Sequence, residues 1–255
     1  MVVDYLRRRW TKRNSIAFIS FLRKKGVTIG TNVHFYGDLQ AVHIDITRPS
    51  LVHIGDNVEI VAPFALMTHG FEWSVFREKY HEIVGSSGKV VIGNNVYMGA
   101  DVTILKGSAI GDNVIIGAKS LINKDIPSNC VATGMPAKRI IDLDAYFEKR
   151  KKACIREAKE YALSIYETLG RSPVEEDFIE FFPLFLKRDE QSIMTFNNKL
   201  RLKMKKERRA TMSVQSQLGA AFEHFLQTQP YYTSFEDFLE DAGIPVKQTK
   251  QLEIS

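Results

Sequence analysis

The chain has few cysteines and no long apolar run near its N-terminus. Only Cys130 and Cys154 occur among 255 residues, too few for the disulfide framework of a small secreted domain. The apolar run of residues 16 to 22 is too short to span a bilayer, and it meets Arg23 instead of a cleavage site. We therefore predict a cytoplasmic protein in a reducing compartment, without an export signal or a membrane span.

Two basic segments raise the question of an anionic partner. Residues 4 to 25 carry eight basic residues against one acidic residue, a net charge of +7. Such a helix could lie on the inner face of an anionic membrane, as a peripheral contact, or cap the open end of a solenoid; we favour the cap. Residues 199 to 209 carry a net charge of +6 without interleaved aromatic residues. There we expect a solvated helix face and no nucleic-acid partner.

What the chain does have is an apolar residue at every sixth position of residues 92 to 127. Neither a helix, which repeats near 3.6 residues, nor a strand, which repeats at 2, explains this spacing. A chain that turns a corner every sixth residue does, because three short strands form a triangular coil and stacked coils share one apolar column. The residues are Ile92, Met98, Ile104, Ile110, Ile116 and Ile122. The pattern predicts a parallel β-helix.

Two further positions of the hexad support this prediction. The residue four positions after each apolar residue is small or β-branched, which we interpret as a crowded corner: Val96, Val102, Ser108, Val114, Ser120 and Ile126. Glycine directly follows four of the six apolar residues, where it gives the backbone room to turn: Gly93, Gly99, Gly111 and Gly117.

The same spacing continues upstream, with two interruptions. It includes Ile29, Phe35, Ile54, Ile60 and Leu66, and it breaks first over residues 41 to 50. The second break separates Leu66 from Ile92 by 26 residues where six would suffice. Insertions in solenoids collect on the working face, so the loop of residues 71 to 89 is the first place to look for chemistry.

From residue 143 the hexads stop and helical patterns replace them. Residues 146 to 170 read as an amphipathic helix closed by Gly170. Ser172 with Pro173, and later Ser234, are each typical of a helix start. Eight phenylalanines in this region are too many for a disordered tail: Phe178, Phe181, Phe182, Phe185, Phe222, Phe225, Phe235 and Phe238. We divide the chain into a basic helical segment (1–26), a β-helix domain (27–142, with the loop 71–89) and an α-helical region (143–255).

The hexads, followed by KDIPSNCVATGMPAKRI at residues 124 to 140, resemble the left-handed β-helix acyltransferases. The galactoside, maltose and capsule or lipopolysaccharide sugar O-acetyltransferases are most similar, and the resemblance covers residues 27 to 141. It implies a mainly β fold, a left-handed parallel β-helix with an N-terminal helical cap and a mostly α-helical C-terminal region. It also implies acetyl-CoA as co-substrate and a sugar hydroxyl as acceptor, in a bacterial surface polysaccharide or its precursor. We expect a homotrimer with its sites at the subunit interfaces.

In that family one histidine, where the long loop leaves the coil, acts as general base, and the matching residue is His69. A sugar hydroxyl attacks a thioester poorly until its proton is taken, and an ordinary imidazole is largely neutral at physiological pH. His81, at the far end of the loop, is the reserve base. The remaining histidines are expected to be structural or solvent-exposed: His34, His43, His53 and His224.

The resemblance also implies a groove for the cofactor. The pantetheine arm of acetyl-CoA would lie against Ala100 and Ala118, which are 18 residues apart, one coil of three hexads. Larger side chains would fill that groove. Lys124 and Lys138 match the positions that contact its phosphates, with Arg139 assisting.

Two residues are predicted to bind the acceptor, Tyr97 and Trp73. Tyr97 stands where the family often has tryptophan. Lys119 stands where glycine is usual, and it could give a different phosphate contact.

Other functions stay open at this point. An N-acetyltransferase acting on an amino-sugar or a serine-type acceptor is one alternative. Zinc hydratases of the γ-carbonic-anhydrase type share the β-helix but need three histidines; the residue five after His69 is Ser74, so we predict no metal site. A non-catalytic scaffold would use the helical region to bind a partner, but an intact His69 argues against it.

Overall fold

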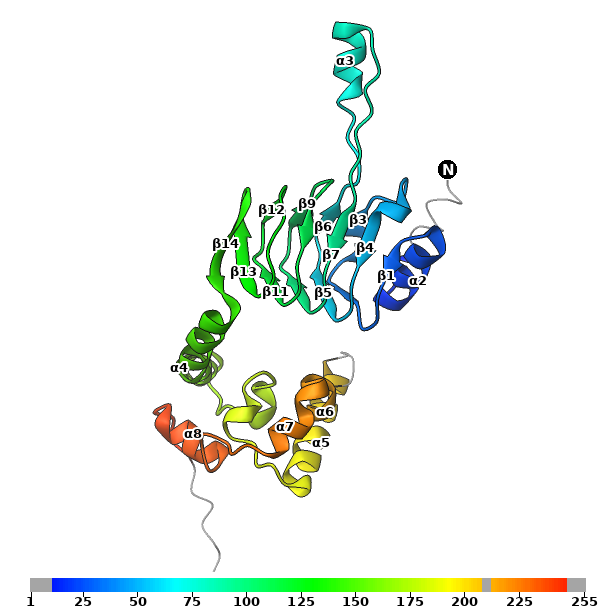
Figure 1. Cartoon of the computed structure of the whole chain (residues 1–255). Coiled ribbons are helices and arrows are strands. Elements are labelled where there is room, and N and C mark those ends of the chain that lie inside the picture. The colour runs from blue at the N-terminus through cyan, green and yellow to red at the C-terminus, as the bar shows by residue number, and fades with distance from the viewer. Residues whose placement is uncertain (1–10, 208–211, 247–255) are drawn as a thin grey trace, which may run out of the picture. The chain divides into compact units, whose positions relative to one another are not determined.

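The structure is a computed structural model that describes residues 11–207 and 212–246. The chain divides between Glu148 and Lys149 into two compact units (Figure 1). Each unit has its own hydrophobic core. Part of the basic N-terminal segment, including Arg7, Arg8 and Arg9, lies outside the described residues.

The first unit is a three-sided β-helix (Figure 1). Successive strands visit three sheets in turn, and the strands in each sheet pair in parallel, apart from the antiparallel β13–β14 pair. Sheet 1 holds β1 (Thr28–Ile29), β4 (Val52–Ile54), β7 (Val90–Ile92) and β10 (Ala109–Ile110); sheet 2 holds β2 (His34–Tyr36), β5 (Val58–Val61), β8 (Val96–Met98), β11 (Val114–Ile116), β13 (Cys130–Gly134) and β14 (Ala137–Asp142); sheet 3 holds β3 (Val42–Ile44), β6 (Phe64–Leu66), β9 (Val102–Ile104) and β12 (Leu121–Ile122). Together with the hexads, this arrangement fits a left-handed β-helix.

The interior column is confirmed. All six apolar residues of the hexads between 92 and 122 are at most 2% exposed. The corner interpretation of the second hexad position is wrong, because Val96, Val102 and Val114 begin strands and are also buried. Alternate residues of a strand face the same side, so the first and third residues of each three-residue strand both point inward. The β-helix therefore has two interior columns per side.

The corners use glycine and asparagine for different reasons. A Cβ atom on Gly99 would lie 2.6 Å from the amide nitrogen of Ala118 on the next coil, so glycine is needed for close approach. Asn95 and Asn113 have φ of 54° and 58°, in the left-handed region that asparagine tolerates. Their side chains also stack, since Asn95 Nδ2 donates to Asn113 Oδ1 at 2.8 Å. We did not predict this ladder, although asparagine recurs just before the strand in several hexads.

Both interruptions of the hexads are insertions at corners. Around the first, two 3₁₀ turns, η1 (Leu39–Ala41) and η2 (Pro49–Leu51), flank β3, which still pairs with β6. The second insertion, residues 70–88, is here named the arm. It projects away from the coils and carries α3 (Trp73–Tyr80) towards its end (Figure 1). No residue of α3 is buried.

Helix α2 (Ser15–Lys25) packs against the first coil. It begins at Asn14, whose side chain accepts a hydrogen bond from the Ala17 amide, and it buries Phe18, Ile19 and Leu22 in the β-helix core. The apolar side of this helix is therefore used inside the protein, which favours the cap over the membrane-surface interpretation. Across residues 11–207 and 212–246, no helix has the length and apolar character that crossing a bilayer requires.

The second unit is helical around a phenylalanine core. Its elements are α4 (Leu143–Leu169), which begins in the first unit, α5 (Glu190–Lys206), α6 (Val214–Leu218), α7 (Phe222–Leu226), α8 (Phe235–Asp241) and the turns η3 (Glu175–Asp177), η4 (Phe182–Leu184) and η5 (Gly219–Ala221). Gly170 follows α4 with φ of 61°. Six of the eight phenylalanines are buried in this core, and Phe181 and Phe222 are partly buried against it. The phenylalanines thus find their burial within one chain.

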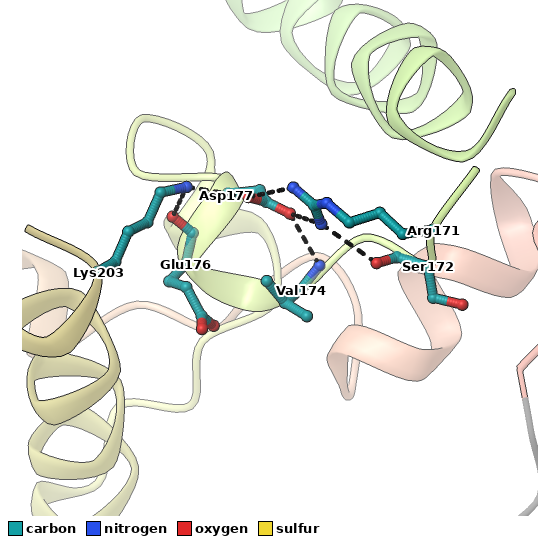
Figure 2. A network of polar contacts seen from close by, with 6 residues as sticks. All are labelled: Arg171, Ser172, Val174, Glu176, Asp177 and Lys203. Atoms are coloured by element: carbon teal, nitrogen blue, oxygen red, sulfur yellow. Dashed lines mark hydrogen bonds and ion pairs between the residues drawn. The ribbon is translucent and has the colours of Figure 1, made fainter. Parts of the chain in front are cut away.

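The helix start predicted at Ser172 and Pro173 is wrong. The acidic stretch that follows forms only the short turn η3, because the carboxylate of Asp177 gathers several donors (Figure 2). It accepts hydrogen bonds from Arg171 at 2.7 Å, from Lys203 of α5 at 2.9 Å and from the Val174 amide at 3.1 Å. A buried carboxylate needs such partners, and satisfying them fixes the turn instead of a helix.

The basic run on α5 is only partly a solvated face. Lys199 pairs with Glu175 at 2.8 Å and Lys203 with Asp177, so these two lysines hold η3 against α5. The expectation holds for the exposed Arg201, Lys205 and Lys206, while Arg208 and Arg209 lie outside the described residues.

Candidate active site

His69 lies where the chain leaves sheet 3 and enters the arm. It follows β6 by three residues and forms an isolated antiparallel bridge with Ser87, which brings the two ends of the arm together. The Gly88 amide donates to the Thr68 carbonyl at 2.9 Å. The base of the arm is thus closed, and His69 is held at the corner between sheet 3 and sheet 1.

The partner of His69 is Asp45, from the preceding coil. His69 Nδ1 lies 2.5 Å from Asp45 Oδ2, and the two side chains are 18% and 8% exposed. The pair forms because β3 and β6 are parallel neighbours with Ile44 beside Leu66, so the residues that follow both strands meet at one corner. We did not predict Asp45. The available signal was an Asp-x-Thr sequence directly after a strand, in the first interruption of the hexads.

Asp45 is held as a carboxylate. Partial burial alone would raise its pKa, but hydrogen bonds from the Thr47 and Thr68 hydroxyls, the Thr47 amide and His69 outweigh burial and bring the pKa well below its usual range. The two hydroxyl contacts measure 2.6 and 2.5 Å. An ionised carboxylate only accepts hydrogen bonds. We therefore assign the ring proton of neutral His69 to Nδ1, which leaves Nε2 free to accept a proton.

An open groove of about 350 Å³ runs beside this pair. Asp45, His69, Thr47 and Met67 line it from the coils, and Lys12 and Phe21 line it from the α2 side. A small ligand can therefore approach the pair from this groove.

The residues predicted to hold the pantetheine arm lie at another corner. Ala100 precedes β9 and Ala118 precedes β12, and the two are stacked one coil apart, since the Lys119 amide donates to the Ala100 carbonyl at 2.8 Å. Lys138, on β14, pairs with Thr133, whose hydroxyl lies close to Gly117. Ala100, Ala118 and Lys138 thus share the corner between sheets 2 and 3.

Lys124 lies at the His69 corner instead. β12 neighbours β9, and β9 neighbours β6, so Lys124 follows sheet 3 two coils beyond His69. One edge of sheet 3 therefore carries His69 and Lys124, and the opposite edge carries Ala100, Ala118 and Lys138. The single chain does not bring the predicted base and the predicted pantetheine groove together.

The other predicted residues are also dispersed. Tyr97 faces outward from the middle of sheet 2 and is 42% exposed, between Glu59 and Ile115 of the neighbouring strands. Trp73 begins α3 on the arm, and His81 follows α3 with φ of 59°. Lys119 also has a positive φ, 58°, the backbone region that explains a preference for glycine there.

The histidines expected to be structural have mixed surroundings. His34 lies 3.0 Å from the Asn32 side chain, and His53 lies 3.2 Å from the Ser50 carbonyl. His43 lines the groove beside His69. Among the described residues, no group of three or more His, Cys, Asp or Glu side chains could hold a metal ion.

Comparisons with known proteins agree with the hexads. Residues 89–124 match the family described as Bacterial transferase hexapeptide (six repeats). Galactoside O-acetyltransferase of Escherichia coli (strain K12) is 36% identical over 121 residues, 45% of this chain and 56% of that protein. Protein CapG of Staphylococcus aureus is 36% identical over 154 residues, 57% of this chain and 87% of CapG. The solved maltose O-acetyltransferase of Clostridium difficile is 25% identical and covers 55% of this chain and 85% of that one, but its TM-score of 0.38 is too low to support an inference.

This chain thus spans little more than half the length of the Escherichia coli galactoside O-acetyltransferase, but most of the length of CapG. The matched region contains the stacked hexads. The chain belongs to the hexapeptide-repeat acyltransferase family, which includes sugar O-acetyltransferases.

Proposed function

We propose that this protein transfers an acetyl group from acetyl-CoA to a hydroxyl group of a saccharide, with His69 as general base. The observation that carries the proposal is the Asp45–His69 pair, with a contact of 2.5 Å at the base of the arm. A relative named as a galactoside O-acetyltransferase supports the sugar acceptor. A bacterial surface polysaccharide or its precursor is the acceptor that we favour, because of the long arm and the added helical unit.

The reaction needs one proton to move twice. His69 Nε2 takes the proton of the acceptor hydroxyl while the hydroxyl oxygen bonds to the thioester carbonyl carbon. The imidazolium that forms is stabilised by the adjacent carboxylate of Asp45. When the carbon–sulfur bond breaks, the departing CoA sulfur takes that proton from Nε2, which yields the acetyl ester, free CoA thiol and neutral His69.

We further propose that the complete site lies between two copies of this chain. One copy would supply His69, Asp45 and Lys124, and its neighbour would supply Ala100, Ala118 and Lys138 from the opposite edge of sheet 3. An interface that joins two different surfaces of one chain closes into a ring when the rotation allows it. A cyclic homotrimer, with three equivalent sites, suits a triangular β-helix.

In this arrangement the exposed corner at Ala118 would leave room for the pantetheine arm. Lys138, beside Thr133, would meet the phosphates from the same copy, and Lys124 would meet them from the copy that supplies His69. In this proposed arrangement acetyl-CoA contacts residues of both copies, and neither edge of sheet 3 alone supplies all of these contacts.

The experiment is acceptor-dependent release of CoA thiol from acetyl-CoA, measured across a panel of sugars, amino-sugars and serine. We expect sugar esters as products, and we expect His69→Ala to lower kcat by about 10²- to 10⁴-fold with little change in CoA affinity. Acetylation of amines alone would refute the O-acetyl assignment. Full activity of His69→Ala would move the base to another residue, with His81 tested next.

A further inference from the structure

A row of aromatic rings leads outward from His69 along the arm. The Phe71 ring lies edge-on to the His69 ring with 5.1 Å between centroids, and the Trp73 ring follows at 6.1 Å from Phe71. The Arg77 guanidinium lies 5.6 Å from the centre of the Trp73 ring. Phe71 is 66% exposed although it is next to the proposed base. Such an exposed aromatic surface on the single chain, beside the proposed base, indicates a binding surface.

The residue between the two aromatic rings is fixed to the coils. The Lys106 ammonium, at the same corner one coil further on, forms an ion pair with Glu72 and a hydrogen bond with the Ser86 hydroxyl. The hydrogen bond from Lys106 is the main reason why the pKa of Glu72 falls to about 2, so this carboxylate stays ionised. Arg48 donates to the Ser86 carbonyl at 3.1 Å. These contacts join both strands of the arm to the coils near its base.

The packing of the arm on the coils is also close. A Cβ atom on Gly88 would lie 2.6 Å from the Gly107 amide nitrogen, so the returning strand of the arm touches the backbone of the next coil. The base of the arm is therefore ordered before any ligand binds. A ligand that stacks on Phe71, beside these anchored residues, has less backbone freedom to remove, which favours binding.

The chemistry of the row fits a sugar better than an apolar protein surface. One face of a pyranose ring presents C–H groups, which pack on the negative face of an aromatic ring, while its hydroxyls point sideways into water or to polar partners. Glu72 and Ser74 alternate with the two aromatic residues and are exposed, and Arg77 follows one turn later. Such alternating aromatic and polar groups suit a polyhydroxylated ligand.

We propose that Phe71 and Trp73 form a saccharide-stacking subsite that takes the sugar unit next to the one acetylated at His69. The proposal rests on the proposed function, and it makes the acceptor an oligosaccharide or a polymer. Lys106 is then a positioning residue, because it acts through Glu72 and the arm.

The test is binding of the full-length protein to a glycan array that pairs each monosaccharide with oligosaccharides of the same sugar. We expect wild type to prefer multi-unit glycans and Trp73→Ala and Phe71→Ala to lose about tenfold in affinity for them. Trp73→Phe should retain most binding. Tyr80→Ala is the matched control, since Tyr80 is an aromatic residue of the same helix, 57% exposed but outside the row, and it should bind as wild type does.

Kinetics on the glycans that bind distinguish a failure of the proposed subsite from a failure of the proposed acetyl transfer. Trp73→Ala should raise KM for the oligosaccharide about tenfold and raise KM for the monosaccharide much less. Lys106→Met should also raise the oligosaccharide KM, and Lys106→Arg should restore it. Equal losses on both acceptors, or no preference of wild type for longer glycans, would overturn the subsite. Glycan binding without acetyl transfer would refute the proposed function alone.

Light scattering tests whether the aromatic row is instead a contact between copies of the chain. If Trp73→Ala lowered the mass of the assembly while Tyr80→Ala did not, the aromatic row would be a contact between copies and the subsite would be refuted. An unchanged mass, together with weaker glycan binding, supports the subsite.

Discussion

At the scale of single residues, the site depends on a carboxylate that selects one proton arrangement on a histidine. Asp45 is nearly buried and accepts hydrogen bonds from two threonine hydroxyls, so it is held both in position and in its ionised form. A histidine without this partner would be free to carry its proton on either nitrogen. The orientation of His69 is therefore as important to the proposed reaction as its presence.

We expect Asp45→Asn to lower kcat by about 10²-fold or more, because an amide can donate to Nδ1 and leave Nε2 protonated. The KM for acetyl-CoA should change little, and steady-state kinetics measures both. Asp56→Asn is the control, since Asp56 also accepts hydrogen bonds from a threonine, Thr31, but lies on another corner. Comparable activity of the two variants would contradict the role of Asp45.

At the scale of elements, the β-helix depends on coils that approach each other more closely than side chains allow. The requirement falls on glycines that directly follow an inward apolar residue, where the backbone of the next coil passes within contact: Gly93, Gly99 and Gly111. In the second unit, the charged turn η3 is held against helix α5 by ion pairs.

Gly99→Ala should destabilise the first unit by about 1 to 3 kcal/mol, because the added Cβ would lie 2.6 Å from backbone of the next coil. Gly85→Ala should be neutral or slightly stabilising, since nothing lies within 4 Å of its Cβ position. Denaturant midpoints with unchanged slopes would measure the difference. Equal stability of the two variants would show that the coils can separate without cost.

The Asp177 turn should make the stability of the second unit depend on pH. Burial raises the pKa of Asp177, but hydrogen bonds from Arg171, Lys203 and the Val174 amide outweigh burial and lower it to about 2 from 3.8. A lowered folded-state pKa stabilises above the unfolded-state value, so about 2 kcal/mol should be present above pH 4 and disappear as the pH falls through 2.

Asp177→Asn should remove that contribution and speed amide exchange in peptides from residues 149 to 206. Hydrogen-exchange mass spectrometry at matched pH isolates this unit from the β-helix. Glu175→Gln is the control, since the Glu175–Lys199 pair is more exposed and should contribute under about 1 kcal/mol. A difference between wild type and Asp177→Asn that persists below pH 2 would exclude this mechanism.

At the scale of the whole molecule, the two edges of sheet 3 carry different halves of the proposed site. Co-expression of His69→Ala with an Ala100→Leu, Ala118→Leu double variant should restore activity that neither has alone. In a random mixture about a quarter of the interfaces combine an intact His69 edge with an intact alanine edge. We therefore expect about a quarter of the wild-type rate.

The matched control is co-expression of His69→Ala with Asp45→Asn. Both lesions lie at the same edge, so no mixed interface regains an intact pair and activity should stay low. Failure of both mixtures to recover activity would place the complete site within one chain. Light scattering on the full chain and on residues 1 to 142 tests the trimer itself, and whether the helical unit takes part in it.

The sequence by itself determined the repeating structure and the place where the long insertion leaves the coils. The hexads are a local pattern, because the position of a residue within its hexad determines whether its side chain points into the coil. The interior column and the corner glycines could therefore be predicted without knowledge of any tertiary contact. The long insertion that interrupts the hexad spacing marked the region, and the resemblance to the β-helix acyltransferases singled out His69 within it. The second column and the asparagine ladder were missed, although their residues recur just as regularly.

Only the tertiary structure decided which residues meet. Neighbouring strands of sheet 1 pair residues that are 25, 38 and 18 positions apart, because insertions lengthen two of the coils. Asp45 reaches His69, and Lys106 reaches Glu72, through this uneven stacking. His69 is separated from Ala100 and Ala118 because it follows a strand of sheet 3 and they precede strands of that sheet. The spacing along the chain determines at which corner of a coil a residue lies. Which residues of neighbouring coils meet at that corner depends on the lengths of the insertions.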